Sequence, residues 1–222
     1  MWPALVWKEW RECSIFAGLA FLALAQLLGE AMDLPLVRLV SLFSTGRGAE
    51  IPLLSGGREA LFTWIMVLVA VIIGFQQTLW ESWRQTTLFL LHRPAPRSQI
   101  YLCKLFAGGS LLLLVGAVPL LVFCLWAATP ATHASPFYWS MSEPWCRSLA
   151  SALACYLGAF YCGLRPARWI GSRLLPAITT GLLVMGLKYV PMPGLWAYFG
   201  LIVLAAGLVF LILEEARVRE YP

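Results

Sequence analysis

The sequence predicts an all-α membrane protein with six transmembrane helices preceded by an N-terminal amphipathic interfacial helix. Three observations predict this class. Of 222 residues, 60% are hydrophobic and 12% are charged, which is more apolar surface than a soluble core can hide. Six apolar stretches approach the roughly 20 residues that a helix needs to cross a bilayer. Eleven tryptophans are typical of a chain that meets the headgroup layer. We therefore treat residues 1–222 as a single transmembrane domain.

Residues 1–12 show an amphipathic pattern at helical spacing. Pro3 suits a first helical turn, where its missing N–H is not needed. The pattern predicts an interfacial elbow helix leading into the first span, with a ragged tail as the alternative. Lys8, Arg11 and the following apolar run also resemble a cleaved secretory signal, but acidic residues are unusual in the charged region of a signal. The apolar face holds Trp2, Leu5, Val6 and Trp10, and the charged face holds Lys8, Glu9, Arg11 and Glu12.

The six spans are expected at residues 13–32, 60–80, 102–128, 148–164, 174–190 and 194–213. Glycine and serine between the first two spans predict an external loop at 33–59, and a second external loop is expected at 129–147. We interpret the aromatic residues of the second loop, including Tyr138, Trp139 and Trp145, as anchors at the membrane interface. Lys188 is expected to reach the outer interface from its span.

The distribution of the 16 lysines and arginines predicts the orientation. With the N-terminus in the cytoplasm, eleven lie inside and five outside, which favours cytoplasmic positions for both termini. This asymmetry accounts for the net charge of +5 without a nucleic-acid partner. The inside set is Lys8, Arg11, Arg84, Arg93, Arg97, Lys104, Arg165, Arg168, Arg173, Arg217 and Arg219, and the outside set is Arg38, Arg47, Arg58, Arg147 and Lys188.

The cytoplasmic connection at residues 81–104 is the most informative stretch. Its first half is amphipathic at helical spacing, and Arg93-Pro94-Ala95-Pro96 then ends the helix, because a proline disfavours helical geometry in the residue before it. Ser98 is placed to cap a new helix that continues through Lys104 into the third span. The connection is more apolar than a loop that only fixes topology needs to be, although that simpler interpretation remains open.

This stretch resembles the permease subunits of type 2 ABC exporters. Their pattern is a glutamate after the second span, a threonine, leucines, a proline, an Arg-Ser pair and a lysine entering the next helix. The residues that occupy it here are Glu81, Thr87, Leu90, Leu91, Pro94, Arg97, Ser98 and Lys104. The resemblance extends to the elbow, the six spans and both cytoplasmic termini.

The resemblance implies that the connection is a coupling helix, which seats in a groove of a partner ATPase. The expected coupling residues are Glu81, Thr87, Phe89, Leu90, Leu91, Arg93, Pro94 and Arg97. Apolar side chains would anchor the contact and arginines would bind carboxylates of the partner. It further implies a multi-pass protein of a cell inner membrane that pairs with an identical or a sister permease.

No GxxxxGK[ST] phosphate loop occurs in the sequence, so we expect no cofactor in this chain and ATP bound by the partner. Intramembrane polar residues are few. Gln76, Gln77, Thr179 and Thr180 are candidates for lining the translocation path, with a bond to a neighbouring helix as the alternative for the glutamines. The apolar composition does not identify a substrate.

Two features of the sequence point to other classes of membrane protein. Glu214-Glu215-Ala216-Arg217-Val218-Arg219 matches the EExxxR motif of intramembrane CAAX-type proteases, but it ends a helix, and His92 and His133 are expected on opposite sides of the membrane. With no GxSxG or HExxH motif, no catalytic or metal-binding residue is expected and the chain is not predicted to be an enzyme. The second rival is a small non-transport membrane protein, such as an accessory or immunity factor.

Overall fold

The computed structural model describes residues 2–32, 53–54, 56–80, 97–129, 136–165, 170–189 and 194–218. The regular elements in this part of the chain are all helices. Six of these helices are long. Of the two short ones, η1 directly follows α3 and η2 directly precedes α7. The long helices are α1 (Trp2–Ala31), α3 (Gly56–Phe75), α6 (Arg97–Ala128), α7 (Glu143–Leu164), α8 (Ile170–Tyr189) and α9 (Gly194–Val218), and the short ones are the π-helix η1 (Gln76–Trp80) and the 3₁₀-helix η2 (Trp139–Ser142).

Each predicted span lies within or close to one long helix, but several boundaries were wrong. α3 begins at Gly56, inside the loop predicted at 33–59. Likewise, η2 and the start of α7 at Glu143 lie inside the loop predicted at 129–147. Pro144 in the first turn of α7 gives the reason: a proline there needs no N–H partner and is preorganised for a helix. The predicted elbow is not a separate helix, because α1 runs without a break from Trp2 to Ala31.

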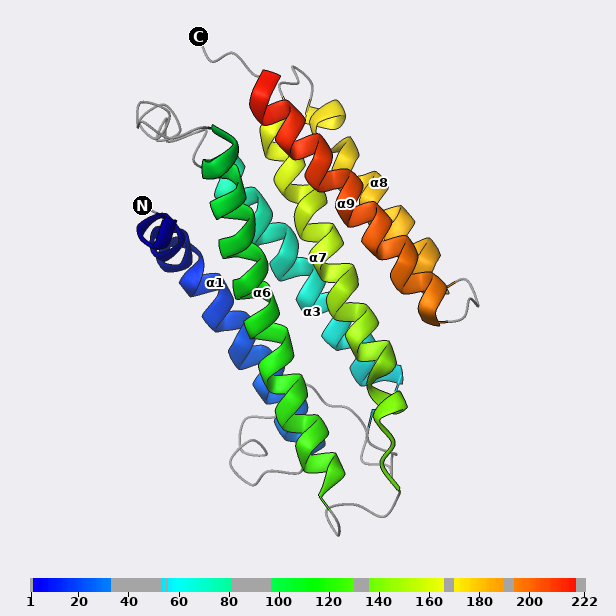
Figure 1. The fold of residues 1–222 in the computed structure, drawn as a ribbon. Coiled ribbons are helices and arrows are strands. Elements are labelled where there is room, and N and C mark those ends of the chain that lie inside the picture. Colours follow the sequence, from blue (N-terminus) through cyan, green and yellow to red (C-terminus); the bar gives the residue numbers. More distant parts are fainter. Residues whose placement is uncertain are drawn as a thin grey trace.

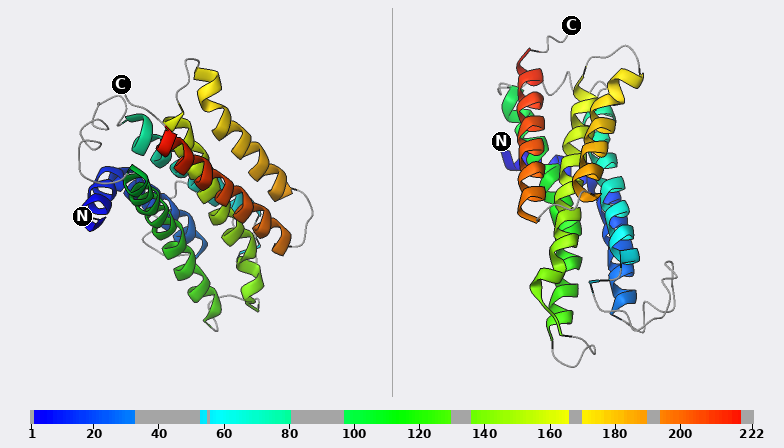
Figure 2. Two further views of the ribbon diagram at one scale, coloured as in Figure 1. Left: turned by 45° about the horizontal axis from the view of Figure 1, so that its top comes forward. Right: turned by 90° about the vertical axis from the view of Figure 1, so that its right-hand side faces the viewer.

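The helices run up and down between two ends of an elongated bundle (Figure 1). We call the end at which α1 begins and α9 ends the terminal end. There η1 also ends and α6 begins, so the segment 81–96 joins two helices at the terminal end. The first turns of α1 cross the direction of the other helices before the helix bends along the bundle (Figure 2). The first residues of α1 and the last residues of α9 therefore lie at the same end of the bundle (Figure 1).

In the part of the chain that the structure describes, four helices are long and apolar enough to cross a membrane, namely α1, α3 with η1, α6 and α9. The more polar α7 lies inside the bundle, where it packs on α3, α6, α8 and α9. Its buried face is built from alanine, serine, glycine and cysteine together with large aromatics. Because its neighbours are helices, we expect α7 to need less apolar surface than a helix facing lipid.

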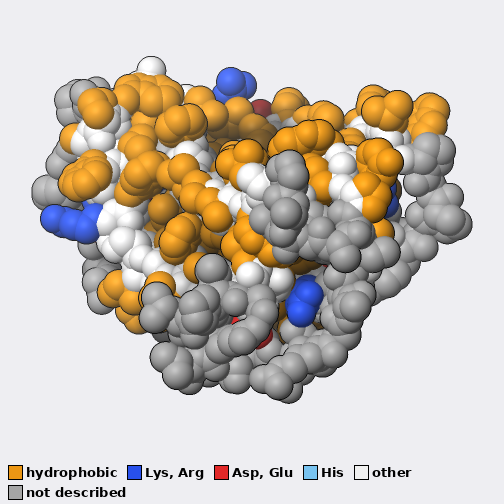
Figure 3. Space-filling model, turned by 90° about the horizontal axis from the view of Figure 1, so that it is seen from below, with side chains coloured by type: hydrophobic (Ala, Val, Ile, Leu, Met, Phe, Trp, Pro, Cys, Tyr) orange, Lys and Arg blue, Asp and Glu red, His pale blue; other side chains and the backbone are white. Residues whose placement is uncertain are grey.

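The outer surface of the described part is strongly apolar. Large hydrophobic side chains of α1, α3, α6, α8 and α9 are exposed, with Leu195 at 84% and Ile15 at 70%. Seen from the end opposite the termini, hydrophobic side chains dominate the described surface and charged ones are scattered (Figure 3). A surface of this kind fits a bilayer and not water. The chain is therefore an apolar helical bundle suited to a membrane.

Trp145 corrects one prediction about the aromatic residues. Expected as an interface anchor, it is fully buried and packs on Phe62 and Phe123, with ring centroids 5.2 and 6.0 Å away. Its indole N–H donates to the carbonyl of Leu53 at 3.0 Å. Trp139 is exposed. The reason is the earlier start of α7, which carries Trp145 into the helix and turns it toward α3 and α6.

Candidate functional site

The terminal end of α3 changes from α-helix to a single turn of π-helix, η1. A π-turn inserts one extra residue per turn and often marks a functional position. In η1, the side chains of Gln77 and Thr78 are buried. Thr78 occupies the space beside Gly163 of α7, where an added Cβ would collide with its hydroxyl. The π-turn thus brings Gln77 into the interior beside α6.

Gln77 and Lys104 hold each other through reciprocal bonds. The Lys104 ammonium donates to the Gln77 carbonyl at 3.2 Å, and the Gln77 amide Nε2 donates to the Lys104 carbonyl at 3.2 Å. These two residues lie near the two ends of the segment 81–96, one just before it and one shortly after it. The ends of the helices that this segment joins are therefore fastened directly to each other.

Glu9 of α1 bridges the same pair. Its Oε1 accepts from Lys104 Nζ at 3.1 Å, and its Oε2 accepts from Gln77 Nε2 at 3.3 Å. Both ionic side chains are almost fully buried, with 3% of the Glu9 side chain and 4% of the Lys104 side chain exposed. An ion pair out of water is held firmly only when further bonds satisfy its remaining polar atoms. Gln77 supplies such bonds to both partners.

Tyr156 of α7 closes the arrangement. Its hydroxyl donates to Gln77 Oε1 at 2.7 Å and lies 3.3 Å from the Lys104 carbonyl oxygen. An added Cβ at Gly108 would collide with this hydroxyl and lie 2.6 Å from Gln77 Oε1, so α6 approaches closely only because residue 108 is glycine. We call Glu9, Gln77, Lys104 and Tyr156 the Glu9 cluster. It joins α1, η1, α6 and α7 in one buried network.

Two further contacts tie the first turns of α1 to the helices around the segment 81–96. The Trp10 indole N–H donates to the Ala107 carbonyl at 3.1 Å, with Ser110 Oγ 3.3 Å away. Gln76 Nε2 donates to the Glu12 carbonyl at 2.7 Å. Three positions of α1 therefore bond to these elements: Glu9 to both, Trp10 to α6 and Glu12 to η1.

The expected coupling residues lie mostly outside the described part of the chain. This applies to Glu81, Thr87, Phe89, Leu90, Leu91, Arg93 and Pro94, and Arg97 is described only as the first residue of α6. The structure places η1 and the start of α6 beside one another at either end of that stretch. The coupling role of these residues stays a prediction.

The four candidates for lining a path lie in different surroundings. Gln77 is buried in the Glu9 cluster, and Gln76 contacts α1. Thr180 is buried against Gly158 of α7, and its hydroxyl donates to the Pro176 carbonyl at 2.7 Å. Thr179 is exposed and donates to the Leu175 carbonyl at 2.9 Å. The structure therefore shows helix-to-helix contacts for both glutamines, and path lining stays a prediction.

Sequence reasoning missed two members of the site and placed a third wrongly. Glu9 was assigned to the solvent face of the elbow, yet it lies on the buried face of α1 with Leu5 and Cys13. The signal was present, because residues 5, 9, 13 and 17 recur at helical spacing. Lys104 was noted only as a basic residue entering a span, although its neighbours are apolar. For Tyr156 no signal in the sequence distinguishes it from other buried aromatics.

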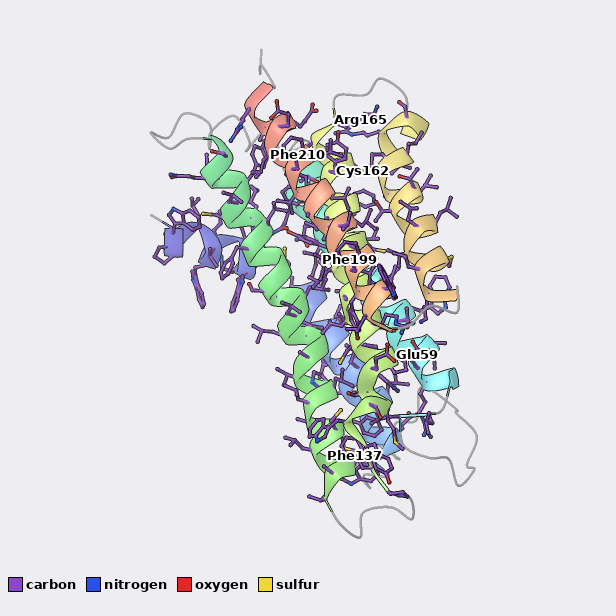
Figure 4. All side chains as sticks on the ribbon, turned by 45° about the vertical axis from the view of Figure 1, so that its right-hand side comes forward. Glu59, Phe137, Cys162, Arg165, Phe199 and Phe210 are labelled. Atoms are coloured by element: carbon purple, nitrogen blue, oxygen red, sulfur yellow. The ribbon has the colours of Figure 1, made fainter. Side chains whose placement is uncertain are left out.

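A second polar group lies toward the opposite end of the bundle, where Figure 4 labels Glu59. Lys188 Nζ of α8 donates to Glu59 Oε1 at 2.7 Å and to Thr63 Oγ1 at 2.8 Å. Ser148 Oγ of α7 also donates to Glu59 Oε1 at 2.7 Å. We call these four residues the Glu59 cluster. The prediction that Lys188 reaches the interface omitted this ion pair.

No protein-family model, no curated protein and no solved structure matches the chain in comparison with known proteins. The resemblance to ABC permeases therefore rests on the residue pattern alone. Among the described residues, no group of three or more His, Cys, Asp or Glu side chains is arranged to hold a metal ion. The polar atoms of the Glu9 cluster bond to one another, so the cluster connects four helical elements and presents no arrangement for a metal ion.

Proposed function

We propose that this chain is the membrane-spanning permease subunit of an ABC exporter, whose ATPase is a separate protein. The observation that carries the proposal is the Glu9 cluster, which fastens the two ends of the 81–96 connection to each other and to α1. A force that a partner applies to this connection passes into the bundle through those ends. Glu9 then carries it into α1, so that three helices move together.

This arrangement suits coupling better than it suits a loop that only fixes topology. Such a loop needs basic residues but no buried ion pair at its base. Burying an ion pair is expensive in free energy, and a matched apolar contact would often be as stable. A buried, directional network instead keeps helices in one register. In the proposal, segment 81–96 therefore forms the coupling helix, and its apolar and arginine side chains contact the ATPase.

The remaining features of the proposal follow from the helix count. α7 has 22 residues and α8 has 20, which is the length that a helix needs to cross the hydrocarbon core, so we take all six to cross the membrane, with both termini in the cytoplasm. Six spans would form half of a translocation path. The functional unit is then two permeases, identical or sister copies, in a cell inner membrane with two ATPases. The chain itself performs no chemistry.

Co-purification tests the proposal directly. The tagged chain is expressed with its genomic neighbours, extracted in detergent and examined for a co-eluting ATPase subunit. We expect an ATPase to elute with the wild-type chain and to be lost with the double variant Leu90→Asp, Arg93→Glu, because the variant removes an apolar anchor and reverses a charge at the contact.

The control is a matched double variant, Arg47→Glu, Leu54→Asp, in the loop predicted on the other side of the membrane. It carries the same chemical changes and should retain the ATPase. Both variants must elute at the position of the wild-type chain, which shows that they fold. If no ATPase elutes with the wild-type chain and the chain is stable alone, the exporter proposal is wrong and an accessory membrane protein explains the chain better.

A further inference from the structure

α8 is a continuous helix that contains Pro176, about one third of the way along its length. A proline inside a helix has no N–H to donate, and its ring pushes against the carbonyl of the residue four positions earlier. Here that carbonyl belongs to Ser172, and Arg165 Nη1 donates to it at 3.5 Å. The N–H of Ala177 donates to Cys162 Sγ at 3.2 Å. Groups at the end of α7 thus bond to two backbone groups of α8 on either side of Pro176.

The short part of α8 before Pro176 is anchored to α7. Arg173 donates through Nε to the Cys162 carbonyl at 3.4 Å and through Nη2 to the Gly163 carbonyl at 3.2 Å. Carbonyls in the last turn of a helix have no partner within the helix, so a guanidinium that caps two of them holds both helices together. Cys162 and Arg165 lie beside this part of α8 in Figure 4.

The longer part of α8, residues 177–189, contacts α7 through Thr180 and α9 through Leu187. The large hydrophobic core of the described part includes residues of α1, α3, α6, α7 and α9 but none of α8. Val184 instead joins a small separate cluster with Ala154, Cys155 and Leu201. A segment with few buried apolar contacts opens at low free energy. Its polar attachment to α3 is the Lys188 ammonium, which reaches Glu59 and Thr63.

Two glycines in the same part favour bending further. Space remains open where a side chain at Gly181 or Gly186 would begin, since an added Cβ at either position meets no atom within 4 Å. Close packing therefore does not require glycine there, and glycine makes a helix easier to distort than alanine does. The hydroxyls of Thr179 and Thr180 bond back to backbone carbonyls beside Pro176, which also favours a bend.

We propose that Pro176 is a hinge in α8 and that the Lys188–Glu59 ion pair is a latch that holds residues 177–189 against α3 and α7. Glu59 Oε1 accepts from Lys188 and Ser148, and the Thr63 hydroxyl lies 3.1 Å away. The pair is partly shielded, with 22% of the Lys188 side chain and 17% of the Glu59 side chain exposed. Lys188 also lies in the last turn of α8, where a positive charge is favourable.

Within the proposed permease, release of the latch would move α8 at the end of the bundle away from the ATPase. That use of the latch rests on the proposed function. The latch itself is a property of this chain and does not need a partner. Its test therefore uses the full-length chain alone in lipid nanodiscs, so that its result is independent of whether an ATPase co-purifies.

Distances between paired spin labels test the hinge and the latch. Cys146 is the exposed cysteine of the six and is first replaced by serine. Labels at positions 64 of α3 and 185 of α8 report on the latched part, because Trp64 and Met185 are 62% and 45% exposed. Labels at positions 64 and 175 report on the anchored part, where Leu175 is 51% exposed.

We expect Lys188→Met and Glu59→Gln to lengthen and broaden the 64–185 distance distribution and to leave the 64–175 distribution unchanged. Lys188→Arg, which keeps the charge, should behave like the parent chain. The charge-swapped double variant Glu59→Lys, Lys188→Glu should restore a narrow distribution. Adding Pro176→Ala to Lys188→Met should reduce the broadening, because a continuous helix resists bending.

Three outcomes would overturn the proposal. Unchanged 64–185 distances in both single variants would show that the Lys188–Glu59 ion pair does not hold residues 177–189 in place. Equal changes in both label pairs would show that α8 moves as a rigid body without a hinge. A charge-swapped chain that folds, as judged by its elution position, but stays broad would show that lost packing and not lost charge causes the change.

Discussion

At the scale of single residues, Glu9 and Lys104 show how burial changes the meaning of a charge. On an exposed surface an ion pair contributes little, because water already solvates both groups. Here both side chains are almost completely buried, so removing one takes an opposite charge away from the other where water does not replace it. Gln77 bonds to both members and fixes their positions. The pair therefore specifies how α1, η1 and α6 fit together more than it adds net stability.

A double-mutant cycle tests this interpretation. Lys104→Met or Glu9→Leu alone should destabilise the chain by about 3–5 kcal/mol, because each takes a buried opposite charge away from the other residue. The double variant should lose much less, since no charge remains. Unfolding in detergent, followed by tryptophan fluorescence, measures these differences.

The control for this cycle is Glu12→Gln on the same helix, because the Lys8 ammonium also contacts Glu9 at 3.4 Å and a Lys8 variant would disturb the buried pair. Glu12 pairs with Lys8 at 3.5 Å, and 43% and 29% of the two side chains are exposed, so this variant should lose less than about 1 kcal/mol. Additive losses in the Glu9→Leu, Lys104→Met double variant would contradict a coupled buried pair.

At the scale of elements, α7 packs on four other long helices, namely α3, α6, α8 and α9. Small residues allow these helices to approach closely. An added Cβ at Gly74 would lie 2.8 Å from the Tyr156 carbonyl oxygen, and one at Gly158 would lie 2.7 Å from Thr180 Oγ1. Close contact between these helices therefore depends on which glycines face a neighbouring helix. The sequence alone does not show which glycines do so.

Two adjacent glycines of α6 provide a matched pair for this idea. Gly108→Ala should destabilise the chain by about 1–3 kcal/mol through overpacking, because its Cβ would collide with Tyr156 and Gln77. Gly109→Ala should be neutral or stabilising by up to about 1 kcal/mol, since a Cβ there meets no atom within 4 Å. Thermal unfolding of both variants in detergent measures the contrast. Equal effects would show that the Glu9 cluster tolerates a looser helix contact.

At the scale of the whole molecule, orientation in the membrane is the property that most strongly constrains function. Both termini and the helices flanking segment 81–96 lie at the terminal end of the bundle (Figure 1). The excess of lysine and arginine predicts that this end faces the cytoplasm. Cys146, in the first turns of α7, lies at the opposite end and is exposed. It is a natural probe of sidedness, because the other five cysteines are buried.

A membrane-impermeant maleimide should therefore label Cys146 when it is added to the outside of intact spheroplasts. Cys146→Ser should remove the labelling, which identifies the site. Labelling only after the membrane is inverted or broken would contradict the proposed orientation, and with it the position of the coupling segment on the cytoplasmic side.

The sequence by itself determined the membrane class and the approximate positions of the six long helices in the described part of the chain, because hydrophobicity and helical period are properties of short stretches. It also predicts an excess of positive charge on the cytoplasmic side, which stays a prediction. It did not fix helix starts such as Glu143, because Glu143, Pro144 and Arg147 look like loop residues until the packing of Trp145 is known.

Only the tertiary structure decided the candidate site. Glu9, Gln77, Lys104 and Tyr156 are separated by as many as 147 positions along the chain, and a single sequence does not state which distant polar groups meet. Helical period placed Glu9 on the same face as Leu5 and Cys13, but nothing local said that a lysine of α6 lies opposite. The physical reason is that burial and pairing are properties of the packed bundle. Whether a buried charge raises or lowers the free energy of the folded state depends on its neighbours, and the tertiary structure determines these neighbours.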